Sequence, residues 1–382
     1  MTTVYSEIAA AQPLRADAVD VGSKRALVVW LAVCCALVFA MVVVGGITRL
    51  THSGLSITEW QPIVGTLPPS SAADWDDAFA KYRATPEFRE VNHAMTLAEF
   101  KGIFWWEYFH RLLGRAIGVV FLVPYIAFAV RRRIPPGYGW PLAGIFVLGG
   151  LQGVVGWLMV ASGLVDDPRV SQFRLTAHLS LAFAIFGAML WTAMSLAFEP
   201  RMTVRSPARR GPLRLAVAVA ILVFVMVMSG GFVAGIRAGL AYNTFPLMNG
   251  RIVPAEILML DPVWKNFFWN MATVQFDHRL IGWLLALLVP VLAWRVRRDG
   301  TSLRAIRTST ALLLMVLVQL SLGIATLVNG VPLPLAALHQ AGAVVVFGLA
   351  VAVVHAVQAP DARIEHLPNA ARRAMMGDYP ER

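Results

Sequence analysis

The chain has 382 residues, of which 58% are hydrophobic and only 14% are charged, and its mean hydropathy is +0.64. This composition lies outside the usual range of soluble globular domains and predicts a polytopic membrane protein. The net charge of +11 comes mostly from basic residues spread over loops between apolar runs. That distribution excludes the compact basic surface of a nucleic-acid-binding domain.

Eight apolar runs are long enough to cross a bilayer, which takes about 20 residues in a helix. The predicted fold is therefore an all-α membrane protein with eight transmembrane helices. The runs cover Leu27–Ile47, Trp106–Val130, Trp140–Ala161, Phe173–Phe198, Leu213–Gly235, Ala272–Trp294, Thr308–Val328 and Leu335–Val357.

The first run is predicted to be an uncleaved span. The residues before it include acidic side chains and lack the small-residue cleavage site of a secretory signal. Their acidity favours a bacterial inner membrane over a mitochondrial one. Cys34 and Cys35 are adjacent within this run and point to different helix faces, so we expect packing residues rather than a disulfide.

Basic residues fill alternate loops and predict the orientation in the membrane. Under the positive-inside rule they are cytoplasmic, which places both termini in the cytoplasm. The residues concerned are Arg15, Lys24, Arg25, Arg131, Arg132, Arg133, Arg201, Arg205, Arg209, Arg210, Arg295, Arg297, Arg298, Arg304 and Arg307.

An internal repeat divides the chain into two halves of four spans. Met41-Val-Val-Val-Gly45-Gly46 in the first span matches Met226-Val-Met-Ser-Gly230-Gly231 in the fifth. An even number of spans per half predicts a parallel duplication about an axis along the membrane normal. The predicted units are a cytoplasmic segment 1–26, a four-helix bundle 27–198, a cytoplasmic linker 199–212, a second four-helix bundle 213–357 and a cytoplasmic tail 358–382. The long first outer loop is expected to be a cover or a docking surface.

Four histidines recur in this pattern near the outer ends of their spans: His110, His178, His278 and His339. An imidazole is costly in hydrocarbon and needs a partner for its nitrogens. Two histidines facing each other across a helical bundle suit a bis-histidine haem in each half. A hydrogen bond to a carbonyl or serine of a neighbouring helix is the structural alternative, and zinc is disfavoured because no cysteine completes a tetrahedral set.

The residues beside two of these histidines differ between the halves. Glu107 lies three positions before His110 on the same helix face, whereas the matching position before His278 is Gln275. A buried carboxyl there is a candidate acid, base or stabiliser of positive charge, unless it forms a structural pair with Arg111 or Arg115. Arg111 and Arg279 are candidates for binding haem propionates, with snorkelling to lipid phosphate as the alternative.

Together, the eight spans, the duplicated unit, the Glu107-to-Arg111 motif and the three further histidines resemble the haem A synthase family. The resemblance covers about Leu27 to Val357. It implies oxidation of the C8 methyl group of haem O to the formyl group of haem A for cytochrome oxidase. By the same resemblance, His110 and His178 ligate the substrate haem, His278 and His339 ligate a b-type haem, and Glu107 is the essential acidic residue. The first loop lacks the cysteine pair of many bacterial members, so the chain resembles the cysteine-free subgroup.

The resemblance also implies partners and a location. Haem O arrives from a haem O synthase, the haem sites lie near the periplasmic side, and electrons leave through the b haem to an acceptor that the sequence does not identify. Two successive oxidations would give an alcohol and then a hydrated aldehyde. Close-packed spans of this type are compatible with a homo-oligomer. A dihaem electron-transfer cytochrome and a transporter built from parallel repeats remain alternatives.

Overall fold

The computed structural model describes residues 21–61, 64–164, 168–198 and 210–358. Regular structure in these residues is helical, apart from an isolated bridge between Met248 and Arg251. Eight of the described helices are long and apolar enough to cross a membrane, which confirms the all-α membrane fold and the predicted number of spans. Residues 1–20, 199–209 and 359–382 lie outside the described residues, and so do the basic residues that the orientation argument places in them.

The spanning helices are α1 (Val21–Leu50), α4 (Leu97–Val130), α5 (Gly139–Ala161), α6 (Gln172–Ala197), α7 (Arg210–Gly235), α9 (Met271–Arg298), α10 (Leu303–Val328) and α11 (Leu333–Gln358). Short helices occupy the loops: η1 (Val64–Thr66), α2 (Ala72–Arg83), α3 (Pro86–Glu90), η3 (Ala238–Leu240), η4 (Val263–Lys265) and α8 (Asn266–Trp269). Each span is one continuous helix, which does not match the interrupted helices expected of the transporter alternative.

Helix α4 is longer than the apolar run predicted from Trp106, because it begins nine residues earlier, at Leu97. It begins at Leu97 because Thr96 and Glu99 form a capping box: the Thr96 hydroxyl accepts from the Glu99 backbone N–H, and the Glu99 carboxylate accepts from the Thr96 N–H. Its 34 residues span about 50 Å, more than the roughly 30 Å of bilayer hydrocarbon. The first turns of α4 therefore stand outside the apolar layer.

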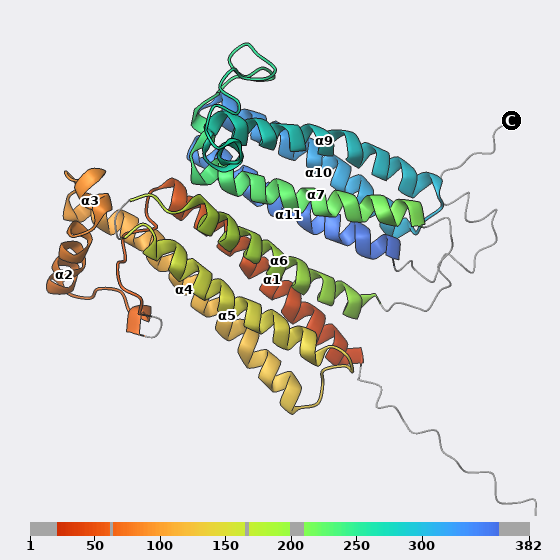
Figure 1. The fold of residues 1–382 in the computed structure, drawn as a ribbon. Helices are drawn as coiled ribbons and strands as arrows, with labels where there is room; N and C mark the ends of the chain where they lie inside the picture. The colour runs from red at the N-terminus through yellow and green to blue at the C-terminus, as the bar shows by residue number, and fades with distance from the viewer. Residues whose placement is uncertain (1–20, 62–63, 165–167, 199–209, 359–382) are drawn as a thin grey trace, which may run out of the picture.

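The spans pack as two rings of four helices (Figure 1). In one ring α1 contacts α4 and α6, and α5 contacts the same two helices; in the other, α7 and α10 both contact α9 and α11. The rings meet along α1, α6, α7 and α11, where the Phe183 and Phe347 ring centroids lie 5.5 Å apart. Origin by parallel duplication and the boundaries of the two units stay predictions.

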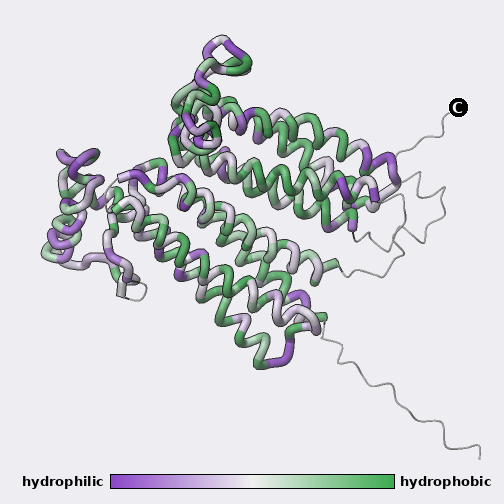
Figure 2. Tube along the Cα trace, viewed as in Figure 1, coloured by the Kyte–Doolittle hydropathy of each residue, from purple (hydrophilic) through white to green (hydrophobic). Residues whose placement is uncertain are grey.

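Hydrophobic residues predominate along the spans, as contact with lipid requires (Figure 2). On α4 and α5 few residues are buried, and Val119, Val123 and Val147 are examples of large apolar residues that are exposed. Polar residues gather instead at the helix ends and in the loops. Cys34 and Cys35 are buried in α1 with free thiols, which confirms their predicted packing role.

The long first loop is folded onto the extension of α4. Tyr82 of α2 and Phe100 of α4 are fully buried, with ring centroids 5.2 Å apart. Trp75 of α2 packs edge-on against Phe104 at 4.9 Å and contacts Trp105 at 5.9 Å. This aromatic cluster fixes α2 and α3 at one end of the bundle, the same end that carries residues 236–270 (Figure 1). We call this end the loop end.

Candidate functional site

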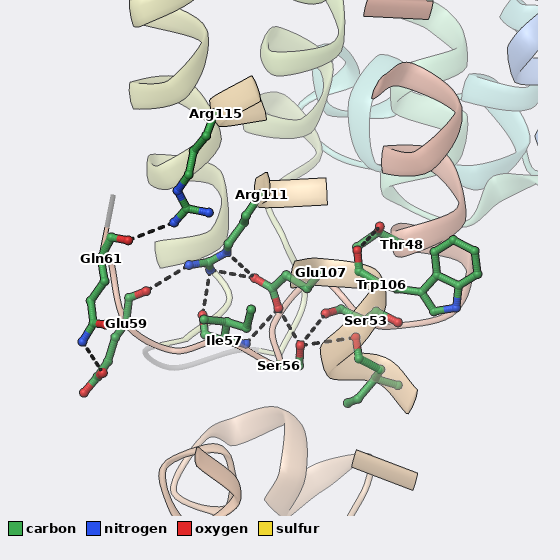
Figure 3. Close-up of polar contacts among 11 residues, drawn as sticks. Thr48, Ser53, Ser56, Ile57, Glu59, Gln61, Trp106, Glu107, Arg111 and Arg115 are labelled. Carbon is green, nitrogen blue, oxygen red and sulfur yellow. Dashed lines mark hydrogen bonds and ion pairs between the residues drawn. The ribbon is translucent and has the colours of Figure 1, made fainter. Parts of the chain in front are cut away.

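Glu107 lies on α4 near the loop end and is 2% exposed. One carboxylate oxygen, Oε2, accepts hydrogen bonds from the Ser56 hydroxyl (2.7 Å) and the Ile57 backbone N–H (2.8 Å). The other, Oε1, accepts from Arg111 Nη2 (2.6 Å) and Nε (3.0 Å), as Figure 3 shows. The structure therefore contains the Glu107–Arg111 pair that the sequence left as the structural alternative. The pair holds the carboxylate in one orientation.

Arg111 also fastens the first loop to α4. Besides its bonds to Glu107, it donates from Nη1 to the Glu59 carbonyl (2.9 Å) and from Nη2 to the Ile57 carbonyl (2.7 Å) (Figure 3). A guanidinium has five N–H donors, and four are used here. Bidentate hydrogen bonding to a haem propionate needs two donors, so one of these four bonds would have to break. The propionate role of Arg111 therefore stays a prediction. Arg115, the other candidate partner of Glu107, donates to the Gln61 carbonyl at 2.9 Å.

The second ring of helices contains a neutral counterpart of this arrangement on α9. Gln275 is 2% exposed; its Nε2 donates to the Ala238 carbonyl (2.9 Å) and its Oε1 accepts from Arg279 Nη2 (3.2 Å). Arg279 also donates to the Tyr242 carbonyl at 2.9 Å. The propionate role of Arg279 stays a prediction as well. The two halves thus use an arginine in the same way, but only the first carries a carboxylate.

The four predicted histidines lie on α4, α6, α9 and α11, two in each ring of helices. His110 and His178 lie on α4 and α6 of one ring of helices, and His278 and His339 lie on α9 and α11 of the other. No group of three or more His, Cys, Asp or Glu side chains among the described residues could hold a metal ion. The arrangement therefore consists of two pairs of imidazoles, and a pair is what a haem iron takes as axial ligands.

Each histidine ring lies against a glycine of a neighbouring helix. A Cβ built on the glycine would approach the ring at 3.0 Å for Gly45 with His110, 2.7 Å for Gly156 with His178, 3.4 Å for Gly230 with His278 and 2.8 Å for Gly323 with His339. A methyl group would crowd the imidazole at three of these positions. The glycines thus leave space for rings that must also accommodate a ligand, and the residues present fit a bis-histidine haem in each half.

Two glutamines form hydrogen bonds with the histidines of α6 and α11. Gln152 of α5 donates to the His178 carbonyl at 3.0 Å, and its amide nitrogen lies 3.4 Å from His178 Nε2. Gln319 of α10 donates to the His339 carbonyl at 2.8 Å and lies 3.2 Å from His339 Nδ1. His178 Nδ1 is buried, and no described residue forms a hydrogen bond with it. A buried polar atom left unpaired in apolar surroundings is costly, which agrees with a ring that has a further partner when the protein is loaded.

His278 makes the contact that the sequence offered as the structural alternative, because its Nδ1 lies 3.2 Å from the Ser229 hydroxyl on α7. The contact leaves Nε2 available. The hydrogen bond and iron ligation are therefore compatible, since a ligating histidine commonly donates its other N–H to a neighbour.

The loop ends of the two rings are joined by His52 and Arg237. Arg237 Nη2 lies 3.2 Å from His52 Nδ1, and both residues have left-handed backbone, with φ of 57° and 54°. Burial, together with the charges of Arg237 and Arg49, holds the pKa of His52 below its usual value. His52 therefore links the loop of the first ring to that of the second.

Sequence reasoning did not find the residues that contact the carboxylate and the histidines. Ser56 and the Ile57 N–H lie in a loop whose path the composition does not reveal. Gln152 and Gln319 each lie four residues before a glycine that faces a histidine, and this shared spacing was the available signal. Ser229 was visible as the one polar residue before Gly230, in a place where the first half has Val44.

Comparison with known proteins identifies relatives along nearly the whole chain. Residues 28–351 match the COX15-CtaA family model, described as cytochrome oxidase assembly protein. A protein of Nitrosospira multiformis named heme A synthase is 58% identical over 332 residues, covering 87% of this chain and 93% of the relative. Proteins with the same name from Nitrosomonas eutropha and Rhodospirillum centenum are 54% and 47% identical over 322 and 352 residues. These alignments cover 84% and 92% of this chain, and 90% and 92% of the relatives.

Proposed function

Because the chain belongs to the COX15-CtaA family of cytochrome oxidase assembly proteins, we propose that it is a haem A synthase. It oxidises the C8 methyl group of haem O to a formyl group, in the membrane, and so supplies haem A for cytochrome oxidase. The observation that carries this proposal is the identity of 58% over 93% of the length of a relative named heme A synthase. The duplicated histidine pairs support it independently.

We propose different tasks for the two histidine pairs. His110 and His178 bind the substrate haem O, and His278 with His339 bind a resident haem b. The support is the difference at one position, where the first half has the carboxylate of Glu107 and the second has the neutral amide of Gln275. When bound, haem b supplies one-electron redox chemistry, through which electrons leave the substrate site.

We propose that Glu107 acts as a fixed negative charge beside the substrate methyl group. Its four hydrogen bonds, two to each oxygen, hold the carboxylate in place before any substrate arrives. A preoriented charge stabilises positive charge that develops at the methyl carbon as electrons are removed, and it does so without reorganisation during the reaction. With water as the oxygen source, oxidation of the methyl group to the alcohol and then to the hydrated aldehyde releases two electrons and two protons in each step. The electrons go to the acceptor, and the hydrated aldehyde then loses water to give the formyl group.

We propose that the loop end faces the periplasm and that both termini are cytoplasmic. Among the described residues, Arg131, Arg132 and Arg133 follow α4, and Arg295, Arg297 and Arg298 close α9, all at the end opposite the loops (Figure 2). The positive-inside rule assigns that end to the cytoplasm. Relatives from bacteria and eight apolar helices fit a multi-pass protein of the inner membrane.

The proposed substrate implies a supplier and an acceptor. Haem O carries a long apolar tail, so it enters from the membrane after a haem O synthase has made it. The electrons pass to an acceptor that we leave open. Self-association of the chain is a further open proposal.

Mass analysis of the extracted haems tests the function. The protein is purified from a host that makes both haem B and haem O, alongside the variants His110→Ala and His278→Ala. We expect haem B together with haem O, its hydroxylated form or haem A in the unaltered protein. His110→Ala should lose the modified haems, and His278→Ala should lose haem B. Haem B alone at two per chain would instead make the protein an electron-transfer cytochrome.

A further inference from the structure

The hydrogen bonds of the histidines are not the same in the two halves. On α6 and α11 the bonds to the histidine carbonyls match, since Gln152 and Gln319 donate to His178 and His339, although Gln152 lies beside Nε2 of its histidine ring and Gln319 beside Nδ1. On α4 and α9 they differ. His278 Nδ1 has the Ser229 hydroxyl at 3.2 Å, whereas the described residues provide no hydrogen bond to either ring nitrogen of His110.

The difference traces to one position of the repeat. Val44 and Ser229 each directly precede a glycine that lies against a histidine, Gly45 in α1 and Gly230 in α7. Their separation of 185 residues is also that of His52 and Arg237, which contact each other and share a left-handed backbone. Val44 and Ser229 are thus equivalent, and only the second has a hydroxyl.

The histidine rings are also turned differently. The atom of His110 nearest to a Cβ on Gly45 is Nε2, at 3.0 Å. The atoms of His278 nearest to a Cβ on Gly230 are Cε1 at 3.4 Å and Nδ1 at 4.0 Å. Nδ1 of His278 therefore faces α7 and its serine, and no described residue hydrogen-bonds to its Nε2, whereas His110 presents Nε2 to Gly45 of α1.

We propose that Ser229 is a positioning residue that accepts the Nδ1–H of His278, fixing Nε2 for a resident haem and lowering that haem's reduction potential. The inference rests on the proposed function, which gives the second half the haem b. Iron binding through Nε2 places the ring proton on Nδ1, and a hydroxyl oxygen can accept it. The hydrogen bond increases electron donation from the imidazole to the iron, which favours the ferric state.

The same contrast explains why one half retains its haem and the other exchanges it. A ring fixed by a second hydrogen bond is preorganised for permanent binding. A ring without that bond turns more freely, as a site that takes up haem O and releases haem A requires. Val44 therefore suits a substrate site, and Ser229 suits a cofactor site.

The test uses full-length protein purified from a host that makes haem B but no haem O. Redox titration and the rate of haem transfer to apomyoglobin are measured for the unaltered protein, Ser229→Ala and Ser229→Thr. Loss of a partner of a metal ligand typically weakens metal binding by about tenfold or more. A tenfold loss confined to the ferric state raises the midpoint by about 59 mV for one electron. Ser229→Ala should show this rise and faster haem loss, and Ser229→Thr should behave as the unaltered protein does.

Two further variants keep the proposal open to refutation. Ser321→Ala removes a hydroxyl of α10 that bonds only to the Leu317 carbonyl (3.0 Å) among the described residues, and it should leave the midpoint unchanged. Val44→Ser gives the first half the missing hydroxyl; this variant is purified from a host that also makes haem O, and it should release haem O from that half more slowly than the unaltered protein from the same host. The proposal is overturned by a loaded Ser229→Ala protein with an unshifted midpoint, by an equal shift in Ser321→Ala, or by unchanged release in Val44→Ser. Failure of the proposed function would look different, because extracts of the unaltered protein from a host that also makes haem O would then contain haem B alone at two per chain, or no haem.

Discussion

Replacing Glu107 by glutamine separates the charge of this side chain from its packing. In the structure one oxygen faces Arg111 and the other faces the Ser56 hydroxyl and the Ile57 N–H. Gln275 shows how an amide behaves in the equivalent place, with its oxygen toward the arginine. The new amide NH₂ of Glu107→Gln would then face Ile57. The Ser56 hydroxyl can turn to accept from it, but a backbone N–H cannot.

The expected cost in stability is small and the expected cost in activity is large. One buried N–H, that of Ile57, loses its acceptor, which costs about 1–3 kcal/mol. The fixed negative charge near the substrate also disappears, and removal of one such electrostatic contact typically lowers the rate by about 10²–10³-fold. Glu107→Gln should therefore fold, retain both haems and convert haem O about 10²–10³ times more slowly.

The assay follows haem O, its hydroxylated form and haem A by chromatography of extracts from purified protein, with total haem and thermal stability measured on the same samples. Ser56→Ala is the matched control, because it removes a 2.7 Å hydrogen bond to the carboxylate and keeps the charge. It should cost comparable stability and retain most of the conversion. Conversion by Glu107→Gln at the unaltered rate would refute the electrostatic role, and loss of haem from that variant would show that the residue acts in binding instead.

Two other predictions follow from the geometry. Gly156→Ala places a methyl group 2.7 Å from His178 Cε1. It should displace the imidazole and weaken retention of the substrate haem by about tenfold or more. Gly118 has open space around it, so Gly118→Ala should leave the haem content unchanged. Burial raises the pKa of Glu87, in α3, to about 7 from 4.5, so the folded state holds its proton more tightly and stability falls as pH rises from about 4.5 to about 7. Glu87→Gln should remove this loss of stability, which amounts to on the order of 1–3 kcal/mol in the free energy of unfolding at pH 8. Glu90→Gln, on the exposed side of the same helix, should not remove it. Equal pH profiles of thermal stability for the unaltered protein and Glu87→Gln would contradict the assignment.

The sequence determined the features of this protein that depend on composition and on the length of its apolar runs. Eight spans, an all-helical fold and packing cysteines follow from apolar runs long enough to cross hydrocarbon, because a chain in lipid must satisfy its backbone within each helix. The sequence also predicts the histidine pairs and the difference between Glu107 and its equivalent Gln275, because polar side chains are rare in apolar runs. The resemblance to the family rested on these residues, and the relatives confirmed it.

Only the tertiary structure decided what those residues touch. The α4 extension begins at a capping box that a hydropathy pattern does not register, and the loop that supplies Ser56 and Ile57 to Glu107 has no periodicity to reveal its path. The pairing of Glu107 with Arg111 was one of several options on the same helix face until the geometry selected it. Ser229 shows the limit most clearly. Its place in the repeat can be read from the sequence, but its contact with His278 Nδ1 at 3.2 Å cannot. A hydrogen bond depends on the distance and direction between its two atoms. Packing between helices that are far apart in the chain sets both.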